Sequence, residues 1–149
     1  MSNKGTERQD VGLQVFQEHE SLRLGTEAVQ AAAERVAEGE AVRWTEVNVV
    51  LGDHALIRSL NRKWLHHDWN TDVVSFPLDE DAREQGEIEG EVYVDLDTAR
   101  EVAPEHRVSF ETEALRYVIH GLLHLVGHDD ATDEERAEMR ALEDRYLQG

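Results

Sequence analysis

The sequence predicts an α+β fold, α/β-like in its alternation of elements, in which a small sheet packs against helices within a single domain. Segments with the apolar pattern of strands take turns along the chain with segments that have the spacing of amphipathic helices. The length of 149 residues is that of one domain and suffices to bury a core without disulfide bonds. We therefore expect residues 1–149 to form one domain, in which the polar residues 1–10 are flexible.

The first half of the chain is expected to alternate between strands and helices. Residues 11–16 have a strand pattern, and residues 22–38 have a helical one with a packing face of Leu24, Ala28, Ala31, Ala32 and Val36. Residues 45–51 alternate enough to pair as a second strand. Asp53 is suited to cap the next helix, whose apolar residues are Leu56, Ile57, Leu60 and Trp64.

The middle of the chain is expected to be extended. Residues 71–76 have a strand pattern that ends at Pro77, which cannot donate a main-chain hydrogen bond. Residues 79–89 are strongly acidic and are interpreted as a solvent loop. Residues 90–95 are expected to form a further strand.

Two helices complete the chain. A long helix over residues 110–126 is expected at the centre of the domain, because one face carries Leu115, Val118, Ile119, Leu122, Leu123 and Val126. The sequence from Thr132 to Glu135 fits the capping box that opens a helix. The buried face of this last helix is expected to contain Met139, Leu142 and Tyr146.

Two histidines on the long helix, His120 and His124, indicate a metal site. Residues four apart on a helix project to the same side, so the two imidazoles can bind one cation at about 2.0–2.1 Å. Both lie away from the centre of the apolar stripe and therefore face solvent or a cleft. Because this spacing alone is weak evidence, solvated histidines and a purely structural ion remain the alternatives.

The residues that follow the histidines can supply a third ligand. Gly127 can end the helix and turn the chain back, which brings Asp130 within reach. Asp130 is not needed as a helix cap, because Thr132 can take that role. His128 and Asp129 are alternative third ligands, although a residue next to the glycine turn has less room to reach back. Three protein ligands leave one coordination position open, as in catalytic zinc sites.

Composition and charge restrict the partners and the compartment. The 33 acidic and 15 basic residues give a net charge of −18, which should repel phosphate backbones. With only two lysines and with its acids spread along the chain, the sequence suggests a salt-rich cytoplasm, where such charges are screened. The absence of cysteine means that any metal must use histidine and carboxylate ligands. No apolar run has the length of a membrane span, so we expect a cytoplasmic protein without membrane contact.

Several segments resemble one known family. The run HGLLHLVGHDD over residues 120–130 is similar to the HGxLHLxGyDH signature of the YbeY family of zinc-dependent endoribonucleases. Leu60 and Asn61, the run TDVVSFP over residues 71–77 and the run GEVYV over residues 90–94 are similar to the family's LN, T[ND]VLSFP and GDIxI segments. Their order and spacing also match, so the resemblance covers most of the chain and is far more specific than the histidine pair alone.

The resemblance implies a fold, a cofactor and an activity. The fold would be a small mixed sheet with helices, and one Zn²⁺ per chain would lie in a cleft beside the central helix, bound by His120, His124 and Asp130. The activity would be single-strand-specific, metal-dependent cleavage of RNA, in maturation of the 3′ end of small-subunit (16S) ribosomal RNA and in ribosome quality control. The partners would be that RNA and the small ribosomal subunit, and no DNA partner is expected.

The sequence also departs from the family pattern at two positions. The third ligand of the family is usually histidine, whereas Asp130 makes this site more anionic. The family usually has an arginine five residues after the leucine of LN, which is thought to serve the phosphate, and Leu65 stands there. Positive charge could come instead from Arg62, His66 and His67, which could equally be exposed helix-end residues. Ser75 could add a substrate contact, although its strand could equally serve only the sheet.

The chemistry expected at this site is metal-assisted cleavage of a phosphodiester. Zinc would lower the pKa of a bound water toward about 7 and polarise a phosphoryl oxygen. Gly121 stands where HExxH metallopeptidases have their glutamate base, so that machinery is absent. The alternatives are a zinc hydrolase of another substrate such as a peptide, and a non-catalytic ribosome assembly or RNA-binding factor with a structural metal.

Overall fold

A four-stranded mixed sheet forms the centre of the computed structural model, which describes residues 12–65 and 73–148. The strand order is β1-β2-β4-β3, with β1 at Leu13–Gln17, β2 at Arg43–Gly52, β3 at Val73–Pro77 and β4 at Glu87–Asp95. Strands β1, β2 and β4 are parallel, and β3 runs antiparallel to β4 at one edge. The predicted fold class is therefore confirmed, including the mixed sheet that the family resemblance implied.

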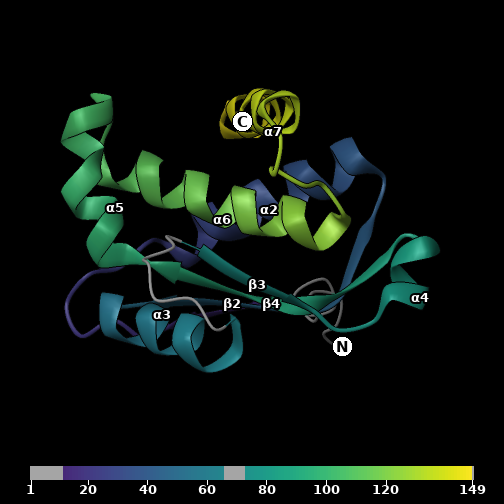
Figure 1. Ribbon diagram of the computed structural model, residues 1–149, viewed down its shortest axis with the longest axis horizontal. Helices are drawn as coiled ribbons and strands as arrows, with labels where there is room; N and C mark the ends of the chain where they lie inside the picture. Colours follow the sequence, from purple (N-terminus) through teal and green to yellow (C-terminus); the bar gives the residue numbers. More distant parts are fainter. Residues whose placement is uncertain (1–11, 66–72, 149) are drawn as a thin grey trace, which may run out of the picture.

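Helices cover both faces of the sheet (Figure 1). Helices α2, Thr26–Glu40, and α6, Phe110–Val126, lie on one face, and α3, His54–Leu60, lies on the other. Helix α7, Asp133–Leu147, packs outside α6 and α2 as a further layer. Helix α5, Leu96–Val102, follows β4 and leads toward the start of α6. Among the described residues, no helix has the length and apolar character of a membrane span.

Several expected elements occur at or near their predicted positions. Helix α6 has the predicted bounds, and the capping box at the start of α7 is present: Glu135 N–H donates to Thr132 Oγ1 at 3.0 Å, and Thr132 N–H donates to Glu135 Oε1 at 3.1 Å. Asp53 caps α3, because its Oδ1 accepts a hydrogen bond from Leu56 N–H at 2.9 Å. After α3 the chain continues as a short π-helix, Asn61–Leu65. Residues 1–10 lie outside the described part, so their expected flexibility stays a prediction.

The prediction of a loop over residues 79–89 was wrong. Asp79 caps a short helix, α4, Glu80–Glu84, by accepting a hydrogen bond from Ala82 N–H at 3.0 Å. Strand β4 then begins at Glu87 rather than at Gly90, and its side chains alternate between buried and half-buried. The glutamates of this strand, Glu87, Glu89 and Glu91, take half-buried positions, which hid its alternating pattern among the surrounding charges.

The expected packing face of the alanine-rich helix was wrong in part. Helix α2 begins at Thr26 rather than near residue 22, and Ala28 and Ala31 are exposed. Val29 and Ala33 are buried in their place, together with the predicted Ala32 and Val36. The many alanines of this helix did not reveal which of its sides meets the sheet, because alanine is compatible with a buried or an exposed position.

Helix α6 is buried on more than the single stripe that the sequence predicted. Its buried residues also include Ala114, Tyr117, Gly121 and Leu125. Gly121 marks the closest approach to the sheet, since a Cβ there would lie 2.4 Å from Val92 Cγ1 and 2.9 Å from Val73 Cγ1. The sheet therefore holds the histidine-bearing part of α6 in close contact with β3 and β4.

Two further short elements, between β4 and α6, were not predicted from the sequence. Helix α5 begins after Asp95, whose Oδ1 accepts a hydrogen bond from Thr98 N–H at 2.9 Å. A 3₁₀ helix, Ala103–His106, follows and ends in a left-handed residue, Arg107. Together they carry the chain from the end of β4 to the N-terminus of α6, and they lie beside the cleft described below.

Candidate metal centre

The side chains of His120, His124 and Asp130 converge at one point. The two histidines lie on α6, and Asp130 follows the turn that ends this helix. The His120 Nε2 atom lies 3.1 Å from His124 Nε2 and 3.3 Å from Asp130 Oδ2, and His124 Nε2 lies 3.5 Å from the same oxygen. Ligand atoms at 2.0–2.1 Å from a tetrahedral ion lie about 3.3–3.4 Å from one another. The spacing of these three donor atoms therefore fits a single zinc-sized ion.

The backbone of α6 and of the turn after it explains this convergence. His120 and His124 are one helical turn apart, and their ring centroids are 4.6 Å apart with an interplanar angle of 76°. Gly127 has φ +124°, a conformation that side-chain-bearing residues rarely adopt, and its N–H donates to the carbonyls of Leu123 and His124. The chain reverses at this glycine and returns Asp130 to the two imidazoles.

Arg136 at the start of α7 holds the loop that carries Asp130. Its Nη1 donates to the main-chain carbonyls of Asp130 at 3.3 Å and of Ala131 at 3.0 Å, and its Nη2 pairs with Asp133. A guanidinium has several donors in one rigid plane, so it can fix two carbonyls at once. The position of Asp130 therefore depends on α7 as well as on the glycine turn.

The alternative ligand His128 has a different partner. Its Nε2 lies 2.7 Å from Glu40 Oε1, and Tyr146 donates its hydroxyl to Glu40 Oε2 at 2.5 Å. Burial alone would raise the pKa of Glu40, but these two hydrogen bonds and the charge of His128 lower it below its ordinary value. His128 thus ties the loop to the end of α2 and lies outside the converging group, and Asp129 is exposed.

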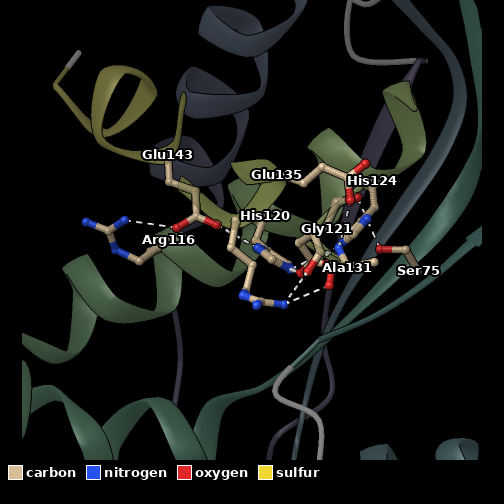
Figure 2. Close-up of polar contacts among 10 residues, drawn as sticks. Ser75, Arg116, His120, Gly121, His124, Ala131, Glu135 and Glu143 are labelled. Atoms are coloured by element: carbon tan, nitrogen blue, oxygen red, sulfur yellow. Dashed lines mark hydrogen bonds and ion pairs between the residues drawn. The ribbon is translucent and has the colours of Figure 1, made fainter. Parts of the chain in front are cut away.

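Glu143 of α7 orients the first histidine (Figure 2). The His120 Nδ1 atom lies 2.6 Å from Glu143 Oε2, and Arg116 Nη1 donates to the other oxygen of Glu143 at 2.9 Å. Glu143 is only 5% exposed and can accept a hydrogen bond from Nδ1–H; in this tautomer the Nε2 lone pair is directed at the converging group. A carboxylate behind a metal-binding histidine fixes its tautomer and ring orientation.

Sequence reasoning missed Glu143, although one signal was available. Glu143 lies within the apolar face predicted for α7, next to Leu142 and between Met139 and Tyr146. A carboxylate on a buried face requires a partner, because an isolated buried charge is costly. The pattern could have indicated a buried partner, but it could not have shown that this partner is His120.

The remaining predicted site residues are Ser75, Arg62, His66 and His67, and neither Ser75 nor Arg62 belongs to the converging group. Ser75 Oγ donates to the carbonyl of Gly121 at 3.1 Å, so it ties β3 to the histidine-bearing helix (Figure 2). Arg62 lines a separate hollow with His54, Arg58 and Lys63, which contains none of the three converging residues. His66 and His67 lie outside the described residues. Their assignment to substrate binding, like that of Arg62 and Ser75, stays a prediction.

A cleft of about 560 Å³ opens beside the converging group. Its walls come from α6, α7, the start of β3 and the segment after β4, and they include both His120 and Asp130. The cleft gives an extended ligand access to His120 and Asp130. The arrangement has the elements of a catalytic metal site: three protein ligands, a supporting carboxylate and adjacent space for a substrate.

Comparison with known proteins places this chain in a family. A family model described as Endoribonuclease YbeY matches residues 8–149. The chain belongs to the YbeY family. The resemblance of its sequence motifs to this family is thereby confirmed, and most of the chain, including all described elements, lies within the match.

Individual YbeY relatives align over nearly their whole length. The Endoribonuclease YbeY of Salinibacter ruber is 46% identical over 140 residues, which cover 91% of this chain and 89% of the relative. That of Chloroherpeton thalassium is 41% identical over 124 residues, which cover 83% of this chain and 85% of the relative. The solution structure of TM1509 from Thermotoga maritima is similar with a TM-score of 0.60 and 31% identity, over 91% of this chain and 87% of that one.

Proposed function

We propose that this chain is a metal-dependent endoribonuclease that binds one Zn²⁺ per chain through His120, His124 and Asp130. The observation that carries the proposal is the convergence of their donor atoms to within 3.1–3.5 Å of one another beside an open cleft. Membership of a family whose curated members bear the name Endoribonuclease YbeY supports RNA as the substrate. Imidazole and carboxylate ligands suit zinc, and the chain has no cysteine to offer in their place.

The side chains around the site have defined tasks in such a reaction. Zinc bound there would supply a Lewis acid and a means of activating water near neutral pH. Glu143 keeps the His120 Nε2 lone pair available by accepting a hydrogen bond from Nδ1–H, and Arg136 holds the loop that presents Asp130. The cleft lies beside His120 and Asp130, so an RNA strand bound in it would have a scissile phosphate next to these residues.

The packing of Gly121 argues against a peptidase of the HExxH type. The glutamate base of those enzymes would occupy this position, but a Cβ here would already lie 2.4 Å from Val92 Cγ1. Helix α6 would have to move away from the sheet to admit the larger side chain. The close contact between α6 and β4 therefore excludes this arrangement of catalytic groups at residue 121.

The substrate that we propose is single-stranded precursor RNA of the small ribosomal subunit, cleaved near the 3′ end of 16S ribosomal RNA. This proposal, with the small subunit as partner and ribosome quality control as the wider role, rests on the family resemblance of the motifs around residues 60–61, 71–77, 90–94 and 120–130. A ribosomal substrate would imply action in the cytoplasm.

Metal analysis combined with an RNA cleavage assay tests the proposal. The purified wild-type chain is expected to contain about one zinc ion and to cleave precursor small-subunit RNA, and the His120→Ala variant is expected to do neither. Circular dichroism checks that the variant is folded. Undiminished cleavage by a rigorously metal-free sample, or by the His120→Ala variant, would contradict the proposal.

Neighbouring aspartates provide a matched test of the third ligand. The Asp130→Asn variant is expected to bind zinc much more weakly, because an amide oxygen is a poorer zinc ligand than a carboxylate. The Asp129→Asn variant removes the same charge one residue earlier, from an exposed side chain, and is expected to keep its zinc. If Asp129→Asn lost its zinc and Asp130→Asn kept it, the third ligand would be Asp129.

A further inference from the structure

An RNA-cleaving enzyme with this composition needs local positive charge at its substrate cleft. The net charge of −18 repels phosphates at long range, so binding must depend on contacts close to the metal centre. The sequence has Leu65 where the family resemblance leads one to expect a phosphate-contacting arginine. The cleft itself shows which residues can take over this task.

The lining of the cleft is much less acidic than the whole chain. Among the described residues, it contains three arginines, Arg116, Arg136 and Arg140, and three carboxylates, which belong to Glu113, Asp130 and Glu143. In the whole chain, by contrast, acidic residues outnumber lysines and arginines by 33 to 15. The lining is therefore close to neutral, and a divalent cation at the metal centre would make it positive.

The carboxylates of the cleft already have partners. Glu113 Oε2 lies 3.0 Å from His106 Nδ1, and Glu143 contacts both Arg116 and His120. Both terminal nitrogens of Arg116 are engaged, because Nη1 donates to Glu143 and Nη2 donates to Asp144 Oδ1 at 2.6 Å. These groups support one another and the metal centre, so they are poorly placed to receive a substrate phosphate.

The two arginines of α7 that line the cleft are differently situated. Arg140 is exposed, and within residues 12–65 and 73–148 its side chain makes no hydrogen bond or ion pair. Arg136, also exposed, is engaged through both terminal nitrogens: Nη1 holds the carbonyls of Asp130 and Ala131, and Nη2 pairs with Asp133. Because the two arginines are four residues apart on a helix, they lie on the same side of α7, about 5–6 Å apart along it.

We propose that Arg140 binds an RNA phosphate next to the scissile bond, and so takes the place of the arginine that the family resemblance leads one to expect at position 65. This inference rests on the proposed function. Guanidinium groups bind phosphate oxygens through paired hydrogen bonds, and the Arg140 side chain lines the same cleft as His120 and Asp130. Glu143, three residues after Arg140, connects the same side of the helix to His120.

RNA binding as a function of salt concentration tests this assignment. The full-length, metal-loaded protein is titrated with a fluorescent single-stranded 2′-O-methyl RNA, whose integrity is checked on a gel after each titration. Loss of one phosphate contact reduces the slope of log K against log salt by about 0.7 for single strands. The Arg140→Gln variant is expected to bind more weakly and to show this reduction, and the Arg140→Lys variant is expected to retain most of the slope.

Arg145→Gln is the matched control, because it removes the same charge from the same helix. Arg145 stacks over the Tyr146 ring, with its guanidinium carbon 5.6 Å from the ring centroid, and it does not line the cleft. This variant is expected to keep the wild-type slope. Equal slopes and affinities for Arg140→Gln and Arg145→Gln would overturn the assignment while leaving the proposed function intact. A wild-type protein that bound no RNA would overturn both.

Discussion

Two histidines of this protein have almost the same carboxylate partner, yet only one belongs to a candidate metal centre. His120 Nδ1 lies 2.6 Å from Glu143, and His54 Nδ1 lies 2.7 Å from Asp95. Both carboxylates are buried, since Glu143 is 5% exposed and Asp95 is 0% exposed. A carboxylate that orients an imidazole is therefore not what distinguishes the metal centre.

The difference lies in what surrounds the other ring nitrogen. The Nε2 atom of His120 faces His124 and Asp130. His124 lies one helical turn further along α6, and the turn at Gly127 returns the chain so that Asp130 reaches His120. The His54 side chain is 37% exposed, and it belongs to none of the metal-competent groups among the described residues. A buried carboxylate fixes the orientation of a histidine whether or not that histidine binds a metal. Metal binding also requires further ligand atoms close to the other ring nitrogen.

The His54 pair instead joins two helix starts on the other side of the molecule. Asp95 caps α5 by accepting hydrogen bonds from Thr98 N–H at 2.9 Å and from Thr98 Oγ1–H at 2.8 Å. Its remaining contact, to His54, ties the beginning of α5 to the beginning of α3. This pair is thus expected to contribute to stability, and the His120 pair to metal affinity.

The largest expected difference between the two pairs appears when histidine is removed. The His124→Ala variant is expected to lose its zinc and its RNA cleavage while remaining folded, because this half-buried side chain lies outside the core clusters. The His54→Ala variant is expected to retain both zinc and cleavage. Metal analysis, a cleavage assay and circular dichroism measure these effects, and zinc loss in the His54→Ala variant would break the comparison.

Removing the orienting carboxylate should weaken the metal centre without abolishing it. We expect the Glu143→Gln variant to bind zinc about 10–100-fold more weakly, because a neutral amide oxygen accepts the hydrogen bond from Nδ1–H more weakly than a carboxylate does. Competition with a chelating dye measures the affinity. Glu138→Gln, at an exposed position of the same helix, is the control. Equal affinities for the two variants would show that Glu143 does not position His120.

The corresponding change at Asp95 should affect stability and leave zinc affinity unchanged. The Asp95→Asn variant is expected to lose about 1–3 kcal/mol of unfolding free energy, because a fully buried acceptor of three hydrogen bonds is altered. Urea denaturation measures the loss. Asp79→Asn is the control, because Asp79 is an exposed helix cap and asparagine caps about as well as aspartate. A variant as stable as this control would contradict the structural role of Asp95.

The smallest expected effect concerns the acid sensitivity of the His54 region. Burial alone would raise the pKa of Asp97, but hydrogen bonds from His54 N–H and His19, with the charges of His19 and Arg100, lower it below its ordinary value. Stability from this group is therefore complete above the ordinary pKa of a free aspartate and is lost as pH falls through the lowered value.

Thermal unfolding at a series of pH values below about 5 measures this contribution. The melting temperature of the Asp97→Asn variant is expected to fall less steeply with acid than that of the wild type. Parallel curves for the two proteins would show that the carboxylate of Asp97 contributes nothing to the pH dependence of stability.

How well each element could be predicted depended on how local its signals are. The bounds of α6 were predicted correctly because an apolar stripe and a terminal glycine both lie within its own sequence. The start of β4 was missed because Glu87 and Glu89 alternate with Ile88 and Gly90, which conceals the strand among charges. In α2, Ala28 and Ala31 were assigned to the core because alanine does not indicate which side of a helix is buried.

The site shows the same division between local and distant signals. His120 and His124 were found because a four-residue spacing on one helix fixes their relation, and Asp130 because a glycine turn limits where the chain can go. Glu143 and Arg140 were not found. They lie on the next helix, and only the packing of α7 against α6 brings them to the cleft.

The sequence by itself determined the helix, the pair of imidazoles, the turn after them and the family of the protein, because each follows from short-range backbone geometry or from motifs along the chain. The tertiary structure alone decided which carboxylate orients His120 and which arginines face the cleft. A buried cluster that includes Ile119, Leu123, Met139 and Tyr146 sets the position of α7 over α6. The packing of such apolar side chains depends on shapes from distant parts of the chain, which no local pattern specifies.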